Sequence, residues 1–371
     1  MLRMLRMLRM LRLIVVGLVT VAGGVVVVTS SALLAQQILG GQQGRQGRQG
    51  QPGPQGQQGR PPIIDMHLHA NSADGNGPPP TYICPGSEKA AHDPRLPWEA
   101  TFTATMRTPP CANPIKGAET DEGLMKSTFE ILERRNIIAV TSGPMLERWR
   151  AAGNERIIPA ATFNFGPGAP SIATLRNGFA AKRYTVFAEV GIQYQGVSPS
   201  DPRFEPYLAV AEAADVPLGI HIGIGPPGAP YFQGLGNYRA RLHSPLELEE
   251  ALVRHPKLRV YIMHAGWPML DDLLAVLWTH PQVHVDVGAI CFALSRKEFH
   301  HYLERIVDAG FVSRVMFGSD QMNWPGVIEY GIEAIESAAF LTPGQKRDIL
   351  YNNAARFLRF TPEQISRHHG R

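Results

Sequence analysis

The sequence has little charge and few cysteines: charged residues make up 18% of its 371 residues, and it has three cysteines. A small scaffold held together by many disulfides is therefore excluded. Residues 1–60 have no lysine and no acidic residue, but they have seven of the 36 basic residues. The remainder therefore has 29 basic and 32 acidic residues, a net charge of −3, although the whole chain has +4. Residues 61–371 thus lack the basic footprint of a nucleic-acid-binding protein.

The N-terminus predicts export. Four arginines within residues 1–12 precede an apolar run at 13–35, which is the order of charges and apolar residues in a secretory signal peptide. Cleavage after Ala35 is one interpretation, although Leu33 stands where a small residue is expected. The run has 23 residues, and about 20 apolar residues can span a bilayer, so an uncleaved membrane anchor is the alternative. Both interpretations export the rest of the chain, because the arginines stay on the cytoplasmic side.

The next segment, 36–61, consists mainly of glutamine, glycine, arginine and proline. It cannot bury enough apolar surface to offset the entropy lost on ordering. We expect a flexible linker here, and the irregular glycine spacing excludes a collagen helix. The folded domain is then expected at 62–371, and a hydrophobic content of 44% over the chain is sufficient for a large core.

Short apolar runs alternate with amphipathic stretches from residue 63 onward. The clearest amphipathic stretch, 121–136, has acidic residues in its first turn and basic residues in its last. Such alternation predicts parallel βα units. The expected strands are 63–69, 136–143, 156–163, 185–191, 217–223, 259–266, 283–290 and 315–320. Eight units over this length match a (β/α)₈ TIM barrel better than an open doubly wound sheet.

Two long loops interrupt the regular pattern, after the first and the fifth expected strands. The first, 70–120, has many prolines, and we expect it to be ordered without a helix. It holds Cys84 and Cys111, and a disulfide between them is the prediction for an exported protein. The second loop is 225–244. A final helix is expected at 343–358, on the outside of the barrel.

Six metal-binding residue types fall at the ends of the expected strands. They are His67, His69, Glu189, His221, His264 and Asp320. The carboxyl ends of the strands meet at one face of a TIM barrel, where enzymes of this fold have their active sites. Imidazole and carboxylate together suit Zn²⁺ and similar metals. We therefore predict a site for a divalent metal, most simply zinc, that activates water.

The motifs DMHLH (65–69), MHAGWP (263–268), FGSD (317–320) and NNAARFLRF (352–360), with the single histidine of PLGIHIG (217–223), resemble the amidohydrolase superfamily. They are most similar to its branch that includes the aminocarboxymuconate-semialdehyde-decarboxylase-like proteins. The resemblance covers residues 62–360.

The resemblance implies roles for these residues. It implies that His67, His69, His221 and Asp320 bind metal. His264 matches a ligand of the second metal in binuclear members and an acid/base residue in mononuclear ones. Glu189 stands where binuclear members have a bridging carboxylate, which favours two metals. The decarboxylase-like members use one metal, so one or two ions remain open.

Three functions are compatible with these residues. The first is hydrolysis of a small amide, lactone or ester, with Asp320 and His264 as catalytic residues: Asp320 moves the proton of the attacking water, and His264 helps to stabilise the developing oxyanion. The second is non-oxidative decarboxylation with one metal, with Arg239 and Arg241 as candidates to hold a substrate carboxylate. The third is an inactive exported binding protein, which the complete metal-binding set argues against. A membrane would be a partner only through an uncleaved 13–35 segment.

Further residues near the strand ends are candidates for supporting roles. Asp286 is expected to support a histidine ligand, because such ligands often donate their other N–H to a carboxylate. Several loop side chains either line a substrate pocket or simply pack, since aromatic residues often do the latter. These are Tyr231, Tyr238, Trp267, Asn323 and Trp324.

Overall fold

The computed structural model describes residues 60–89, 91–223 and 225–370. The predicted leader at 1–35 and nearly all of the predicted linker at 36–61 lie outside these residues and stay predictions. Within the described part of the chain, no helix combines the length and the apolar character needed to cross a membrane.

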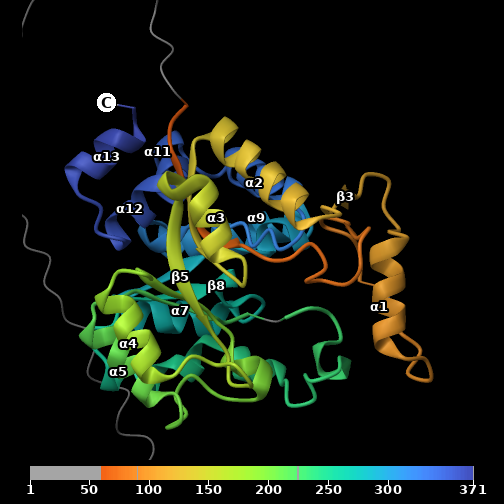
Figure 1. Ribbon diagram of the computed structural model, residues 1–371, viewed down its shortest axis with the longest axis horizontal. Helices are drawn as coiled ribbons and strands as arrows, with labels where there is room; N and C mark the ends of the chain where they lie inside the picture. The colour runs from red at the N-terminus through yellow and green to blue at the C-terminus, as the bar shows by residue number, and fades with distance from the viewer. Residues whose placement is uncertain (1–59, 90, 224, 371) are drawn as a thin grey trace, which may run out of the picture. The chain divides into compact units, whose positions relative to one another are not determined.

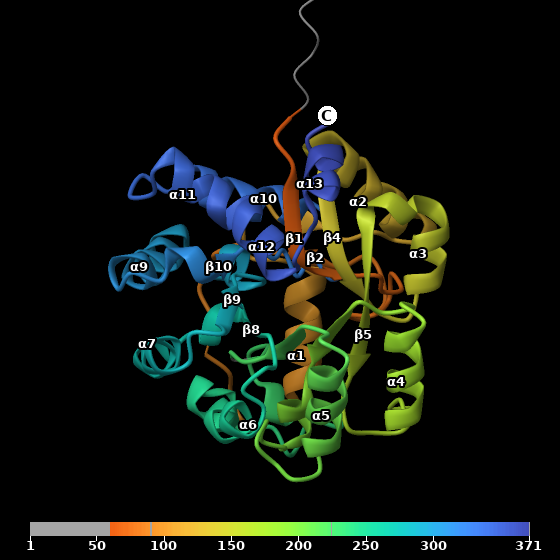
Figure 2. The ribbon, with the colours of Figure 1, turned by 90° about the vertical axis from the view of Figure 1, so that its left-hand side faces the viewer.

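Eight parallel strands form a nearly closed barrel, which confirms the predicted TIM-barrel class (Figures 1 and 2). Each barrel strand pairs with the barrel strand that follows it in the sequence. Two backbone hydrogen bonds join the ends of this series, from Met66 N to Phe317 O at 2.9 Å and from Asp320 N to His67 O at 2.7 Å. The strands are β1 (Ile63–His69), β4 (Ile137–Ser142), β5 (Ile157–Phe163), β6 (Val186–Val190), β7 (Leu218–His221), β8 (Val260–Met263), β9 (Val283–Asp286) and β10 (Val315–Met316).

Helices surround the barrel as the alternation predicts (Figure 2). In α2 (Asp121–Arg135), the side chain of Thr120 accepts a hydrogen bond from Gly123 N and caps the first turn. Asn136 ends this helix in the left-handed conformation. The others are α3 (Leu146–Gly153), α4 (Ile172–Ala180), α5 (Glu205–Ala213), α6 (Glu249–Arg254), α7 (Leu270–Thr279), the short α8 (Ile290–Ala293), α9 (Arg296–Asp308) and α10 (Gly326–Glu336).

The inside of the barrel is filled with side chains, which form the floor beneath the strand ends. Met66, Tyr261 and Met263 are at most 1% exposed and belong to one interior cluster. Gly219 is required beside them, because a Cβ there would lie 2.3 Å from Cζ of Tyr261. The barrel is therefore a packed core, and a substrate can approach only from the ends of the strands.

The insertion at 70–120 departs from the sequence prediction in one respect. Its disulfide between Cys84 and Cys111 is confirmed, and β2 (Tyr82–Ile83) pairs with β3 (Ile115–Lys116). The expectation that it has no helix is wrong, because α1 (Trp98–Arg107) lies within it. Pro97 precedes the first turn and the next proline, Pro109, follows the end of the helix, so no proline interrupts it.

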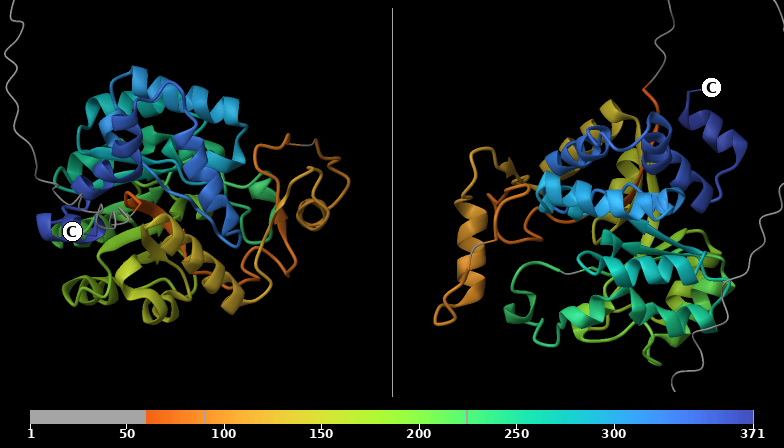
Figure 3. Two further views of the ribbon diagram at one scale, coloured as in Figure 1. Left: turned by 90° about the horizontal axis from the view of Figure 1, so that it is seen from above. Right: turned by 180° about the vertical axis from the view of Figure 1, so that it is seen from behind.

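Helix α1 rests against the loop that follows β7. The rings of Phe102 and Phe232 lie 5.1 Å apart, edge to face. Figure 3 shows the insertion beside the barrel, next to this loop. The two long loops of the sequence are therefore in contact with each other.

The last predicted helix also differs from expectation. It comprises α11 (Pro343–Arg347), a π-helical turn (Asp348–Asn352) and α12 (Asn353–Phe357), and α13 (Pro362–His368) follows. Tyr351, Ala354 and Phe357 join the interior cluster of the barrel. The expectation of a purely outer helix is wrong, because these apolar side chains close the barrel at the amino-terminal ends of its strands.

Candidate metal centre

All six predicted metal-binding residues converge at the carboxyl ends of the strands. Four of them belong to β1, β6 and β7, His264 directly follows β8, and Asp320 lies four residues after the end of β10. The six residues form three overlapping groups, and within each group the possible ligand atoms lie within 4.8 Å of one another. The groups are His67, His264 and Asp320; His67, His69 and Glu189; and Glu189, His221 and His264.

The first half of the centre is built by β1 and Asp320. The Nε2 atoms of His67 and His69 lie 3.1 Å apart. Oδ1 of Asp320 lies 2.9 Å from Nε2 of His69 and 3.6 Å from Nε2 of His67. The spacing of two along the strand thus places both rings on one side, as predicted, although the pairing of β1 with β4 shifts register between Asp65 and Leu68.

The second half is built by His221 and His264. Nε2 of His264 lies 2.9 Å from Nδ1 of His221. Oε1 of Glu189 contacts Nδ1 of His221 and lies 3.5 Å from Nε2 of His264. The other carboxylate oxygen, Oε2, lies 3.6 Å from Nε2 of both His67 and His69. Glu189 therefore stands between the two halves, with one oxygen toward each.

The charges of the histidines keep both carboxylates ionised. Burial raises the pKa of Glu189, but the charge of His221 and hydrogen bonds from the surrounding histidines outweigh it and hold this pKa well below its usual range. Burial likewise raises the pKa of Asp320, and the charge of His67 and contacts with His69 outweigh it and lower this pKa. Conversely, burial lowers the pKa of His67, but Asp320 and Asp286 raise it well above the usual value.

Buried polar side chains hold the two histidines of β1 in place. Asp65 Oδ1 accepts hydrogen bonds from the backbone N–H groups of His67 and Ser319, both at 2.9 Å. Burial raises the pKa of Asp65 to about 6. Gln321 accepts from His69 N at 2.9 Å and donates to His69 O at 2.6 Å. Neither residue was predicted from the sequence, although Asp65 stands two residues before His67 and the two-residue period of a strand could have identified it.

Asp286 takes the supporting position expected of it. Its Oδ2 lies 3.4 Å from Nδ1 of His67. Its Oδ1 accepts hydrogen bonds from the backbone N–H groups of His264, at 3.0 Å, and Gly288, at 2.9 Å. The carbonyl oxygen of Gly288 in turn lies 2.9 Å from Nδ1 of His264. One carboxylate thus fixes the orientation of ligands from both halves of the centre.

Rings from the turn after β6 and from the loop after β7 surround His221. The ring of Tyr194 lies 4.7 Å from that of His221, and the ring of His243 lies 5.4 Å from it. Tyr238 is buried against His243, with ring centroids 4.6 Å apart. Burial, aided by the charges of His221 and His264, lowers the pKa of His243 to about 3. Neither Tyr194 nor His243 has a sequence motif that could have identified it.

The other loop residues are placed differently. Tyr231 is 74% exposed, whereas Asn323 and Trp324 are buried, so these three do not form a common pocket wall. Trp267 donates to Glu298 at 3.2 Å. Arg239 is exposed and donates to the backbone oxygens of Gly236 and Tyr238. Of these candidates, Tyr238 packs against His243 beside the metal centre.

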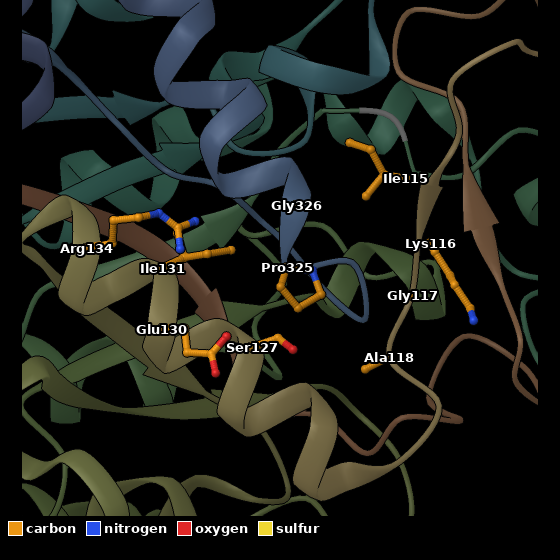
Figure 4. A pocket seen from close by; sticks show the side chains of 10 residues that line it. All are labelled: Ile115, Lys116, Gly117, Ala118, Ser127, Glu130, Ile131, Arg134, Pro325 and Gly326. Carbon is orange, nitrogen blue, oxygen red and sulfur yellow. The ribbon is translucent and has the colours of Figure 1, made fainter.

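A cavity of about 300 Å³ lies elsewhere, between α2, β3 and the start of α10 (Figure 4). Two of its three charged side chains already have partners: Arg134 lies 3.1 Å from Glu329, and Lys116 lies 2.5 Å from Glu119. None of the six residues of the metal centre lines it. We therefore assign this cavity no part in the chemistry.

The side chains of the centre fit divalent cations. In the first half, the Nε2 atoms of His67 and His69 lie 3.1 Å apart. Each of them lies within 3.6 Å of one oxygen of Glu189 and one oxygen of Asp320. Mixed nitrogen and oxygen donors are those that zinc prefers, and a cation would balance the buried carboxylates. The identity of the metal is not specified by these donors.

Known proteins share this architecture. A search among curated proteins finds no match to this sequence. Solved structures with a similar fold include an uncharacterised TIM-barrel protein from Bordetella bronchiseptica, with a TM-score of 0.56 and 17% identity over 84% of this chain and 100% of that one. The 5-carboxyvanillate decarboxylase from Sphingomonas paucimobilis has a TM-score of 0.50 and 13% identity, over 81% of this chain and 100% of its own. A probable 2-pyrone-4,6-dicarboxylic acid hydrolase from Acinetobacter baumannii has a TM-score of 0.50 and 15% identity, over 80% of this chain and 99% of its own.

These structural similarities show a common fold. The family is shown by the sequence itself, because the family model described as Amidohydrolase matches residues 64–360, which is most of the chain. The protein therefore belongs to the amidohydrolase family of TIM-barrel enzymes.

Proposed function

We propose that this protein is a binuclear metal-dependent hydrolase that acts on a small molecule with an amide, lactone or ester bond. The position of Glu189 supports the proposal. Its two carboxylate oxygens face different pairs of histidines, His67 with His69 and His221 with His264. A carboxylate in this position can bind two cations at once, one through each oxygen.

The remaining ligands would divide between two ions. His67, His69 and Asp320 would hold one ion, and His221 and His264 the other. The backbone oxygen of Gly288 lies 2.9 Å from Nδ1 of His264 and favours a hydrogen on that atom. Nε2 of His264 is then unprotonated and faces Glu189 and His221, which suits a metal ligand better than an oxyanion donor. Zinc is the metal that we expect.

Asp320 is the proposed proton carrier. Two bound divalent ions would lower the pKa of water and polarise a substrate carbonyl. Asp320 remains ionised beside His67 and His69, so it can accept the proton of the attacking water. Its Oδ1 contacts His69, whereas its Oδ2 lies 3.9 Å from Nδ1 of His264. From there it would return the proton to the leaving group.

Decarboxylation is the second candidate, supported by the similarity of fold to a decarboxylase. It would use one metal and His264 as the acid/base group. This alternative requires cationic side chains that are free to hold a substrate carboxylate. Arg239 and Arg241 are exposed, and Arg239 is bonded to neighbouring backbone oxygens. Release of CO₂ from an aromatic or enolic acid would favour this alternative over hydrolysis.

We also propose that the enzyme works outside the cytoplasm. The arginine-rich start and the apolar run at 13–35 support this location. The disulfide between Cys84 and Cys111 agrees with it, because disulfides persist in oxidising compartments.

The decisive experiment is the metal content of the full-length protein purified without chelator. Elemental analysis should find about two divalent ions per chain in the wild type and about one in Glu189→Ala. A Glu298→Ala variant, which changes an exposed glutamate on α9, should retain two. One ion in the wild type, unchanged by Glu189→Ala, would favour the mononuclear decarboxylase. No ion after reloading would overturn the metal-dependent function altogether.

A further inference from the structure

His243 is a buried histidine without a satisfied hydrogen-bonding role. It ends the short helical turn Ala240–His243 in the loop after β7 and is 0% exposed. Neither of its ring nitrogens makes a hydrogen bond of normal geometry. A buried polar group left in this way costs free energy, so its retention needs an explanation.

His221 also has a ring nitrogen without a hydrogen-bond partner. Its Nδ1 faces Glu189 and His264, which is the metal side of the ring. Its Nε2 is buried and has no partner. The ring of His243 lies 5.4 Å away, at an interplanar angle of 81°.

His67 and His264 differ from it, because each has a polar group facing its second ring nitrogen, although Nδ1 of His67 makes no hydrogen bond of normal geometry. Nδ1 of His67 lies 3.4 Å from Asp286, and Nδ1 of His264 lies 2.9 Å from the carbonyl oxygen of Gly288. A histidine that binds metal almost always donates its second N–H to such a partner, which fixes its ring and raises its basicity. His221 is thus a ligand whose outer partner is still to be assigned.

We infer that His243 is this partner and positions His221, accepting its Nε2–H directly or through one water molecule. The inference rests on the proposed function, since His221 needs an outer partner only as a metal ligand. A neutral imidazole has one donor and one acceptor nitrogen. The ring nitrogen of His243 that carries no hydrogen can therefore accept the Nε2–H of His221.

The surroundings of His243 hold its ring in place for this role. Tyr238 packs against it on one side, and the hydroxyl of Tyr238 accepts a hydrogen bond from Gly225 N at 2.8 Å. Tyr194 contacts both His221 and His243, with ring centroids 4.7 and 5.9 Å away. The loop after β7 is therefore anchored beside its own strand end, and a residue of that loop can support the ligand of that strand.

Binding of Co²⁺ to the metal-free full-length protein tests the inference, followed by visible absorption. His243→Leu should weaken one of the two binding phases by about 10- to 100-fold, the usual effect of losing an outer partner. His243→Asn and His243→Gln place an amide near the former Nδ1 and Nε2 positions. One of these two should restore most of the affinity. His284→Leu, which changes a partly buried histidine of β9, should leave both phases unchanged.

The results distinguish failure of the positioning role of His243 from failure of the proposed function. Equal weakening of both phases, or no weakening, by His243→Leu would overturn the positioning role while leaving the metal centre intact. Failure of both amides to restore binding would also overturn it, and this comparison holds even if the leucine variant does not fold. Absence of Co²⁺ binding in the wild type would overturn the proposed function and the inference with it.

Discussion

Gln321 bonds both backbone groups of His69, accepting from its N–H at 2.9 Å and donating to its carbonyl at 2.6 Å. The amide is fully buried, so neither bond competes with bulk water. A residue adjacent to one expected ligand, Asp320, thus fixes the backbone of another that lies 252 positions away in sequence.

We expect Gln321→Leu to loosen His69. The substitution removes both bonds and leaves a buried N–H and carbonyl without partners, so the free energy of unfolding should fall by about 1–3 kcal/mol per unsatisfied group. Metal affinity should fall with it, which urea unfolding and a Co²⁺ titration would measure. Gln364→Leu removes a hydrogen bond to Thr361 N far from the centre and is the matched control. Unchanged metal affinity in Gln321→Leu would contradict the supporting role.

Asp320→Asn separates proton transfer from metal binding. An amide can still offer an oxygen to a cation but cannot accept the proton of water, so turnover should fall by about 100- to 10,000-fold. Elemental analysis should show that the metal content is retained. Full activity with metal bound would rule out Asp320 as the proton carrier.

The disulfide should stabilise the insertion. Cys84 and Cys111 are 27 residues apart, and the chain-entropy model gives about 3–4 kcal/mol for a loop of this size. Replacing both by serine should therefore make residues 70–120 more sensitive to limited proteolysis. Reductant should produce the same sensitivity in the wild type but no further change in the double variant. Equal resistance in all samples would show that packing alone holds the insertion.

His284 should make stability depend on pH. Burial lowers its pKa from 6.5 to about 4. Between these values the unfolded chain binds a proton that the folded chain does not, so stability should fall as pH falls from about 6.5 to about 4. Thermal unfolding at several pH values should show a shallower decline in His284→Gln. The exposed His301, changed in the same way, should leave the decline unaltered, and an unaltered decline in His284→Gln would refute the assignment.

Much of the fold could be predicted from periodicity. The eight strands and the outer helices follow from apolar runs that alternate with amphipathic stretches, because burial patterns repeat locally along the chain. Helix α1 and the closure of the barrel by Tyr351 and Phe357 were missed. Their apolar side chains pack against residues distant in sequence, Phe232 and the interior cluster, which no local pattern reports.

The sequence by itself determined the barrel and the face on which six possible ligands lie. Each strand can be recognised from its local apolar pattern, and each ligand stands at the carboxyl end of such a strand. Tertiary structure alone decided how the ligands are shared and supported. The two oxygens of Glu189 face separate histidine pairs. Asp65 and Gln321 hold the backbone of His67 and His69, and Asp286 lies beside the ring of His67. These relationships depend on angles and distances of a few ångströms between elements, and such geometry is set by packing of the whole barrel rather than by any one segment.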